Sequence, residues 1–161
     1  MMIKRLSLAG LAVAVALLGG HVAFLQVRAA MGAKPPESET TTHKVAIQVN
    51  QNERGVMELA LNNAQNIRDY YRSKGEDVTI EIVTYGPGLY MLRAESPLKS
   101  RISVLALETP NLTFSACGVT QANMSRAEGK PIELLGEAKV TPSGVVRLME
   151  LQSQGYAYIR P

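Results

Sequence analysis

The chain contains one cysteine, Cys117, in the stretch LTFSACGVT, and its thiol is the side chain best suited to nucleophilic chemistry. A single cysteine can form no disulfide within the chain and no Cys-X-X-Cys oxidoreductase motif. The two histidines, His21 and His43, lie in a predicted leader and at the edge of the predicted domain. The sequence therefore predicts neither a Ser-His-Asp arrangement nor a histidine-based metal site, and we expect no metal and no cofactor.

The chemistry of Cys117 depends on its place between a predicted strand and a predicted helix. Unpaired backbone N–H groups and the helix dipole favour an anion at such a place, where a thiol pKa of about 8.5 can fall to roughly 3.5–7.5. Gly118, the next residue, would let a ligand approach the backbone closely. Free cysteines are nevertheless among the most buried residues. A reactive thiol and a buried, inert one both remain open.

Several polar or small residues follow the predicted strands and could line a ligand pocket. These candidates are Asn50, Asn52, Tyr85, Gly86, Gly118, Thr120, Ser143 and Gly144. Most of them also fit an ordinary structural role: the two asparagines and Thr120 can cap helices, and Ser143 and Gly144 fit a helix start after Pro142. The glycines at 86 and 88 read G-P-G, which predicts a turn and no phosphate-binding loop.

Alternating or β-branched apolar residues predict five strands, and apolar residues at helical spacing predict the helices between them. The predicted strands are 43–50, 78–84, 112–116, 137–140 and 156–159. The predicted helices are 55–74, 89–94, one opened by Ser96 and Pro97, 120–128, and one opened by 141–144 that ends before Gly155. Gly75, Gly129 and Gly155 are expected to end helices, and Met57, Met91, Met124 and Met149 to fill the core.

Strands that alternate with helices indicate an α/β protein, because right-handed crossovers return each strand to the same direction. We expect a three-layer α/β/α arrangement with a mostly parallel sheet of about five strands, layered as in Rossmann and flavodoxin folds. Ligands of such sheets bind at the carboxyl ends of the strands. Cys117 and the other candidate residues lie at those ends.

The first 42 residues precede the predicted domain. Lys4 and Arg5 stand before an apolar run at 6–18, which is typical of a secretory signal peptide over 1–29. We favour cleavage after Ala29, and an uncleaved membrane anchor is the alternative. The polar, proline-containing stretch 30–42 is a predicted linker to a domain at 43–161. Either form of the leader delivers that domain outside the cytoplasm, to the periplasm in a Gram-negative bacterium.

The charge of the predicted domain argues against nucleic acid as a partner. Residues 43–161 hold 13 Lys and Arg against 12 Asp and Glu, so the basic excess of the whole chain comes from the leader and linker. A net charge of +1 provides no surface for a phosphate backbone. We therefore expect no nucleic acid partner, and a membrane partner only if the leader stays uncleaved.

Four stretches in this order resemble the DsrE/DsrF-like family, most of all its exported, stand-alone members: VAIQVNQN, VTYGPGLYMLR, FSACGVT and VTPSGVVRLMELQSQGYAYIRP. The resemblance covers His43 to Pro161. It implies a DsrE-like fold in which a cysteine at the strand ends carries sulfur as a persulfide between partner proteins, and Cys117 looks like that residue. It also implies a homo-oligomer, a trimer or hexamer.

Three functions stay open on the sequence. The first is a sulfur carrier in sulfur transfer or sulfur oxidation and reduction, in which Cys117 accepts sulfane sulfur without a cofactor; its donor and acceptor are unidentified. The second is a module that binds a small anionic or thiol-containing ligand, with Cys117 lining the pocket. The third is a purely structural oligomer.

Overall fold

The computed structural model describes residues 42–161. The predicted signal peptide and all but the last residue of the predicted linker lie outside the described residues. The strands are β1 (Thr42–Val49), β2 (Asp77–Thr84), β3 (Leu112–Cys117), β4 (Ala138–Thr141) and β5 (Ala157–Ile159). The helices are α2 (Arg54–Ser73), the 3-10 helix η2 (Gly86–Leu92), α3 (Lys99–Glu108), α4 (Gly118–Glu128) and α5 (Gly144–Ser153).

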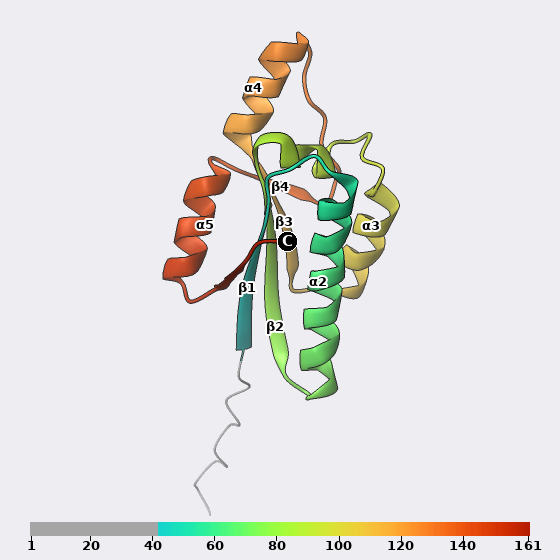
Figure 1. Cartoon of the computed structure of the whole chain (residues 1–161), viewed down its shortest axis with the longest axis vertical. Helices are drawn as coiled ribbons and strands as arrows, with labels where there is room; N and C mark the ends of the chain where they lie inside the picture. The colour runs from blue at the N-terminus through green and yellow to red at the C-terminus, as the bar shows by residue number, and fades with distance from the viewer. Residues whose placement is uncertain (1–41) are drawn as a thin grey trace, which may run out of the picture. The chain divides into compact units, whose positions relative to one another are not determined.

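The strands form one five-stranded sheet in the order β4-β3-β2-β1-β5. Every pairing in it is parallel. The predicted α/β class and parallel sheet are thus confirmed. The carboxyl ends of β1, β2, β3 and β4 meet the starts of α2, η2, α4 and α5 at one edge of the sheet (Figure 1).

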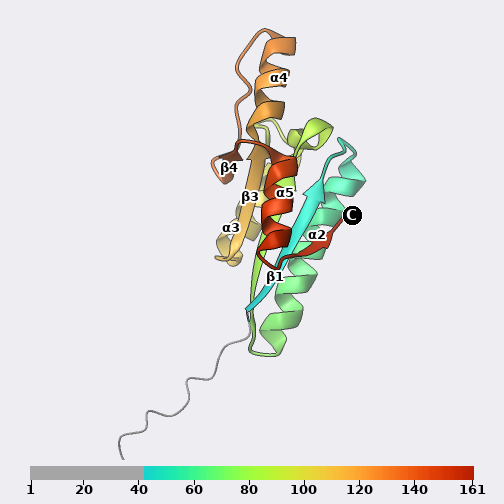
Figure 2. The ribbon, with the colours of Figure 1, turned by 90° about the vertical axis from the view of Figure 1, so that its left-hand side faces the viewer.

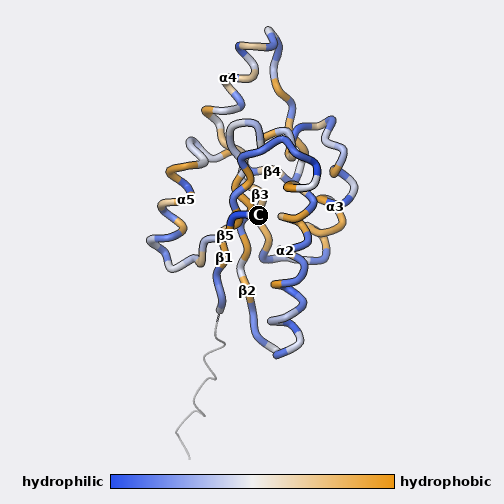
Figure 3. Tube along the Cα trace, in the orientation of Figure 1, coloured by the Kyte–Doolittle hydropathy of each residue, from blue (hydrophilic) through white to orange (hydrophobic). Residues whose placement is uncertain are grey.

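The two faces of the sheet differ in how they are covered. Apolar side chains of β1, β2 and β3 pack against α2 and α3 around the fully buried Phe114, Ile47 and Leu61. On the opposite face α5 packs Leu148 and Leu151 against the sheet. Figure 2 shows α5 on that face, with α2 and α3 behind the sheet and β4 beyond the edge of α5. Figure 3 shows apolar positions along the strands and on α3 and α5.

Three glycines end helices as the sequence predicts. Gly75, Gly129 and Gly155 have φ angles of 71°, 65° and 85°. This left-handed conformation is easy for glycine and terminates a helix. Within residues 42–161, no helix is both long and apolar enough to cross a membrane.

Some local predictions are wrong. The segment expected to form a helix at 89–94 is the 3-10 helix 86–92, and α3 begins at Lys99 rather than after a Ser96 cap. The Ser96 hydroxyl instead accepts the N–H of Leu98 at 3.2 Å, which makes a turn before the helix. Met149 is 65% exposed because the opposite side of α5 faces the sheet, whereas Met57 and Met91 are buried as expected.

Candidate functional site

Cys117 is the last residue of β3 and directly precedes α4. The expectation that Thr120 caps this helix is wrong, because the chain passes from strand to helix without a loop, and Cys117 itself occupies the N-cap position. Thr120 therefore lies in the first turn. The Cys117 side chain is free but only 4% exposed. The candidate nucleophile is thus both at the functional edge of the sheet and largely covered.

The hydroxyl of Thr120 connects Cys117 to the turn that follows β2. Its oxygen accepts the backbone N–H of Gly86 at 2.9 Å, in the turn after β2 where Gly86 has a left-handed φ of 52°. A threonine hydroxyl has one proton to donate. Because the oxygen accepts from Gly86, that proton can be directed at the Cys117 sulfur, and the Thr120 hydroxyl is among the groups that lower the pKa of the thiol.

Two opposed influences set the pKa of Cys117. Burial is the largest single one and raises the pKa, because a thiolate loses its hydration. Hydrogen bonds from the Thr120 hydroxyl and from the backbone N–H groups of Gly144, Thr120 and Val119 together lower the pKa below its ordinary value of 9.0. The sulfur makes no capping hydrogen bond of ordinary geometry. The donors therefore stabilise mainly the charged thiolate. A neutral thiol of equal burial would not need such donors.

The N-terminus of α5 reaches Cys117 because residue 144 is a glycine. A Cβ at Gly144 would lie 2.9 Å from Cβ of Tyr85 and 3.2 Å from Cβ of Cys117. The close approach places the Gly144 N–H against the sulfur and brings the starts of α4 and α5 together at one thiol. Both helix dipoles then favour a negative charge there. Ser143 is the N-cap of α5, although its side chain makes no capping hydrogen bond.

The sequence predicts that Gly118 lets a ligand approach the backbone, but the structure leaves no room for one there. A Cβ at this position would lie 3.2 Å from the carbonyl oxygen of Thr141 and 3.3 Å from Cγ1 of Val140. The end of β4 thus fills the space over Gly118. The N–H of Val119 also donates to the carbonyl of Pro142 at 3.3 Å, which fastens the start of α4 to the loop before α5.

Asn50 and Asn52 are not brought to the thiol. They follow β1, and β2 lies between β1 and β3 in the sheet, so two strand spacings, roughly 10 Å, separate the ends of β1 and β3. The prediction that these asparagines cap α2 is also wrong, because the N-cap is Glu53 and makes no side-chain capping bond. Glu53, Arg54 and Gly55 at the start of α2 are exposed, so water can satisfy their N–H groups.

A buried ion pair on the α5 face of the sheet was not predicted from the sequence. Glu81 is 4% exposed and accepts two hydrogen bonds from Arg147, both 2.7 Å long, and one from the Ser115 hydroxyl at 2.6 Å. Burial raises the pKa of Glu81, but the bonds from Arg147 and Ser115 outweigh it, so the pKa lies below 4.5. An acidic residue within an apolar central strand was the available signal, since buried carboxylates need a partner.

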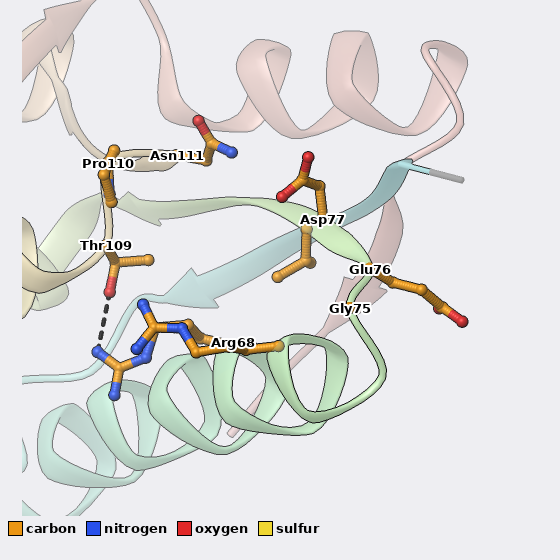
Figure 4. A pocket seen from close by; sticks show the side chains of 9 residues that line it. Arg68, Gly75, Glu76, Asp77, Thr109, Pro110 and Asn111 are labelled. Carbon is orange, nitrogen blue, oxygen red and sulfur yellow. Dashed lines mark hydrogen bonds between the residues drawn. The ribbon is translucent and has the colours of Figure 1, made fainter. Parts of the chain in front are cut away.

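A cavity of about 370 Å³ lies at the amino-terminal ends of β2 and β3, away from Cys117 (Figure 4). Arg68 is one of the charged residues that line this cavity. It is buried and already donates hydrogen bonds to Asp69, Glu108 and the Thr109 hydroxyl. These bonds join α2 to the end of α3, so Arg68 has a structural role. No group of three or more His, Cys, Asp or Glu within residues 42–161 could hold a metal ion.

Comparison with known proteins gives a match among solved structures. No protein-family model matches the chain. No curated protein matches it either. Among solved structures, the chain is similar to MTH1491 from Methanobacterium thermoautotrophicum, a protein of unknown function, with 30% sequence identity and a TM-score of 0.64. The match covers 74% of this chain and 99% of that protein. Identity and coverage of this extent show that the chain belongs to the same protein family as MTH1491.

Proposed function

We propose that the protein is a DsrE/DsrF-like sulfur carrier in which Cys117 holds sulfane sulfur as a persulfide. The observation that supports this most directly is the set of hydrogen-bond donors that surround the Cys117 sulfur and lower its pKa despite burial. A thiolate is the nucleophile that attacks sulfur, whereas a thiol is nearly inert. No cofactor takes part in this reaction.

The proposed step transfers one sulfur atom without net oxidation. The Cys117 thiolate attacks a sulfur atom of a polysulfide, an S–S bond forms at Cys117, and the neighbouring S–S bond of the donor breaks. The bonding electron pair leaves with the shortened polysulfide. A thiolate with one charge and a dianionic polysulfide thus give a persulfide anion and a shorter dianion, so that atoms and charge balance.

The second candidate is a ligand-binding module in which Cys117 only lines the site. The 4% exposure of Cys117 favours it, because a bulky partner has little access to the sulfur. The two candidates differ in whether the sulfur reacts. In the first the thiol gains sulfur at neutral pH, and in the second it stays unmodified.

Mass spectrometry of the reduced protein after incubation with polysulfide tests the proposal. The wild type should gain about 32 Da, one sulfur atom, and lose it again with a thiol reductant. Cys117→Ser replaces the sulfur by the smaller oxygen and should gain nothing while its circular dichroism spectrum is unchanged. If the wild type gains no mass, or if the serine variant gains as much mass as the wild type, the sulfur-carrier proposal is contradicted and the ligand-binding module is favoured.

We also propose that the protein is exported and forms a homo-oligomer, a trimer or hexamer. The apolar run at 6–18 supports export, and the resemblance to the DsrE/DsrF-like family supports the assembly. Intact mass of protein from the exported fraction should correspond to a chain that starts near Ala30, and an uncleaved mass from the membrane fraction speaks for the anchor. Light scattering of that protein measures the assembly, and a single monomeric species contradicts it.

A further inference from the structure

A polar groove lies on the face of the sheet that α5 covers only in part. It has a volume of about 450 Å³, and its wall includes Glu81, Ser115, Lys139, Thr141, Pro142 and Arg147. These residues come from β2, β3, β4 and α5. Figure 2 shows β4 to one side of α5 on this face.

The groove leads toward Cys117. Successive side chains of a strand point to opposite faces, so Ser115 and Cys117 share the face on which Ser115 meets Glu81. Two residues along a strand span about 7 Å. Cys117 is in register with Thr141, a residue of the groove wall. The wall residues Thr141 and Pro142 therefore lie next to the strand end that holds Cys117, although Cys117 itself is not part of the wall.

Lys139 supplies a positive charge to this groove. It is in register with Ser115, so its side chain lies on the same face of the sheet. Arg147 donates two hydrogen bonds to Glu81. Glu150 lies 3.4 Å from Arg147 on the solvent side, and its side chain is 54% exposed. Within residues 42–161 the Lys139 ammonium makes no hydrogen bond or salt bridge, although its charge acts on the Glu81 carboxylate and helps to lower the pKa of that group. Because Arg147 already holds Glu81 through two hydrogen bonds, Lys139 is the cation of the groove wall that is left to meet a ligand.

We propose that this groove binds an inorganic polysulfide anion and presents it to Cys117. The inference rests on the proposed sulfur-carrier function and specifies its donor. An S–S bond is about 2.05 Å long and prefers a dihedral near 90°, so the end atoms of a four-sulfur chain are about 4–5 Å apart. One terminal sulfur near Lys139 then leaves the other end within reach of Cys117, where bond formation and cleavage proceed as described above. Lys139 compensates the negative charge of the polysulfide, and the Ser115 and Thr141 hydroxyls line its path.

Rates of Cys117 modification in the full chain test the groove. Lys139→Gln removes the charge, and Lys139→Arg retains it as the matched control. Tetrasulfide measures sulfur transfer, and iodoacetate and iodoacetamide compare an anionic with a neutral reagent of nearly equal size. A unit charge at about 7 Å near the surface should change the rate with an anion roughly three- to tenfold. Lys139→Gln should therefore lower the rates of Cys117 modification by tetrasulfide and by iodoacetate by this factor and leave the rate with iodoacetamide unchanged. The difference from wild type should become smaller at high salt, because salt screens the charge.

The outcomes separate the groove from the carrier function. If Lys139→Gln and Lys139→Arg react with tetrasulfide and iodoacetate as the wild type does, the groove does not bind the anion, although the carrier function stands. If iodoacetamide modifies Cys117 in all three proteins but tetrasulfide adds no sulfur to any of them, the carrier function fails. In that case the ratio of iodoacetate to iodoacetamide rates still reports whether Lys139 attracts anions to the thiol.

Discussion

Replacement of Gly144 by Ala tests whether the approach of α5 controls the thiol. The added Cβ would lie 2.9 Å from Cβ of Tyr85, whereas ordinary contacts begin at 3.4 Å, so α5 or Tyr85 must move by about 0.5 Å. Because Tyr85 follows a buried central strand, we expect the start of α5 to move and to take the Gly144 N–H away from the sulfur. The pKa of Cys117 should then rise.

The stability of Gly144→Ala follows from two opposed contributions. Overpacking costs about 1–3 kcal/mol. The lower entropy of the unfolded chain returns about 0.4–1 kcal/mol, because the φ of Gly144 is not in the left-handed region. The net loss in unfolding free energy should be about 1–2 kcal/mol. Gly55→Ala is the matched control, since Gly55 also lies in a first helical turn but has open space around its Cβ position. We expect it to leave the thiol unchanged and the stability equal or higher.

Two measurements decide the outcome for Gly144→Ala. The pH dependence of alkylation by iodoacetamide gives the pKa of Cys117, and urea unfolding followed by circular dichroism gives the free energy of unfolding. A variant that loses stability but keeps the wild-type alkylation profile would refute the reasoning, because it would show that the Gly144 N–H contributes nothing to the thiolate. An unchanged stability would show that the contact with Tyr85 relaxes without cost.

Two further predictions concern the same thiol. Thr120→Val removes the hydroxyl that joins Gly86 to the sulfur and should raise the pKa of Cys117 in the alkylation profile, whereas Thr120→Ser should keep it; equal profiles would remove this hydroxyl from the site. Because folding lowers the pKa of Cys117 below 9.0, the stabilisation is fully present above the unfolded pKa and is lost as the pH falls through the folded pKa. Urea unfolding of wild type and Cys117→Ser between about pH 6 and pH 9 should therefore show a wild-type advantage that grows with pH, and a constant difference contradicts this linkage.

The fold could be predicted because its signals are local. Strand β2 is visible as a run of β-branched residues, and the ends of α2 and α4 are visible as Gly75 and Gly129. Alternation of strand and helix then leaves few arrangements other than a parallel sheet. The errors fell where several local signals compete: Ser96 and Pro97 fit a helix start, but the hydrogen bonds of Ser96 form a turn before α3, which begins at Lys99.

The candidate site was predictable only in part. The rule that ligands bind at the carboxyl ends of parallel strands placed Cys117, Gly86 and Gly144 at one edge, and the structure brings them together. The same rule included Asn50, because the order of strands along that edge is not encoded locally. The Glu81–Arg147 pair was missed for a similar reason, since its partners are 66 residues apart and meet only when α5 packs on β2.

Burial and hydrogen bonding at Cys117 act against each other, and their combination limits the functions that fit. An inert core cysteine gains nothing from N–H groups and a hydroxyl directed at its sulfur, since a neutral thiol is a weak acceptor. An open, activated thiol would in turn oxidise readily, because no second cysteine of the chain can protect it. A thiolate favoured by the starts of two helices and only 4% exposed is consistent with both conditions, because it would admit narrow reagents and exclude wide ones. A chain of sulfur atoms is a reagent of this narrow kind, and Thr141, which is in register with Cys117, belongs to the wall of the groove that we propose it occupies.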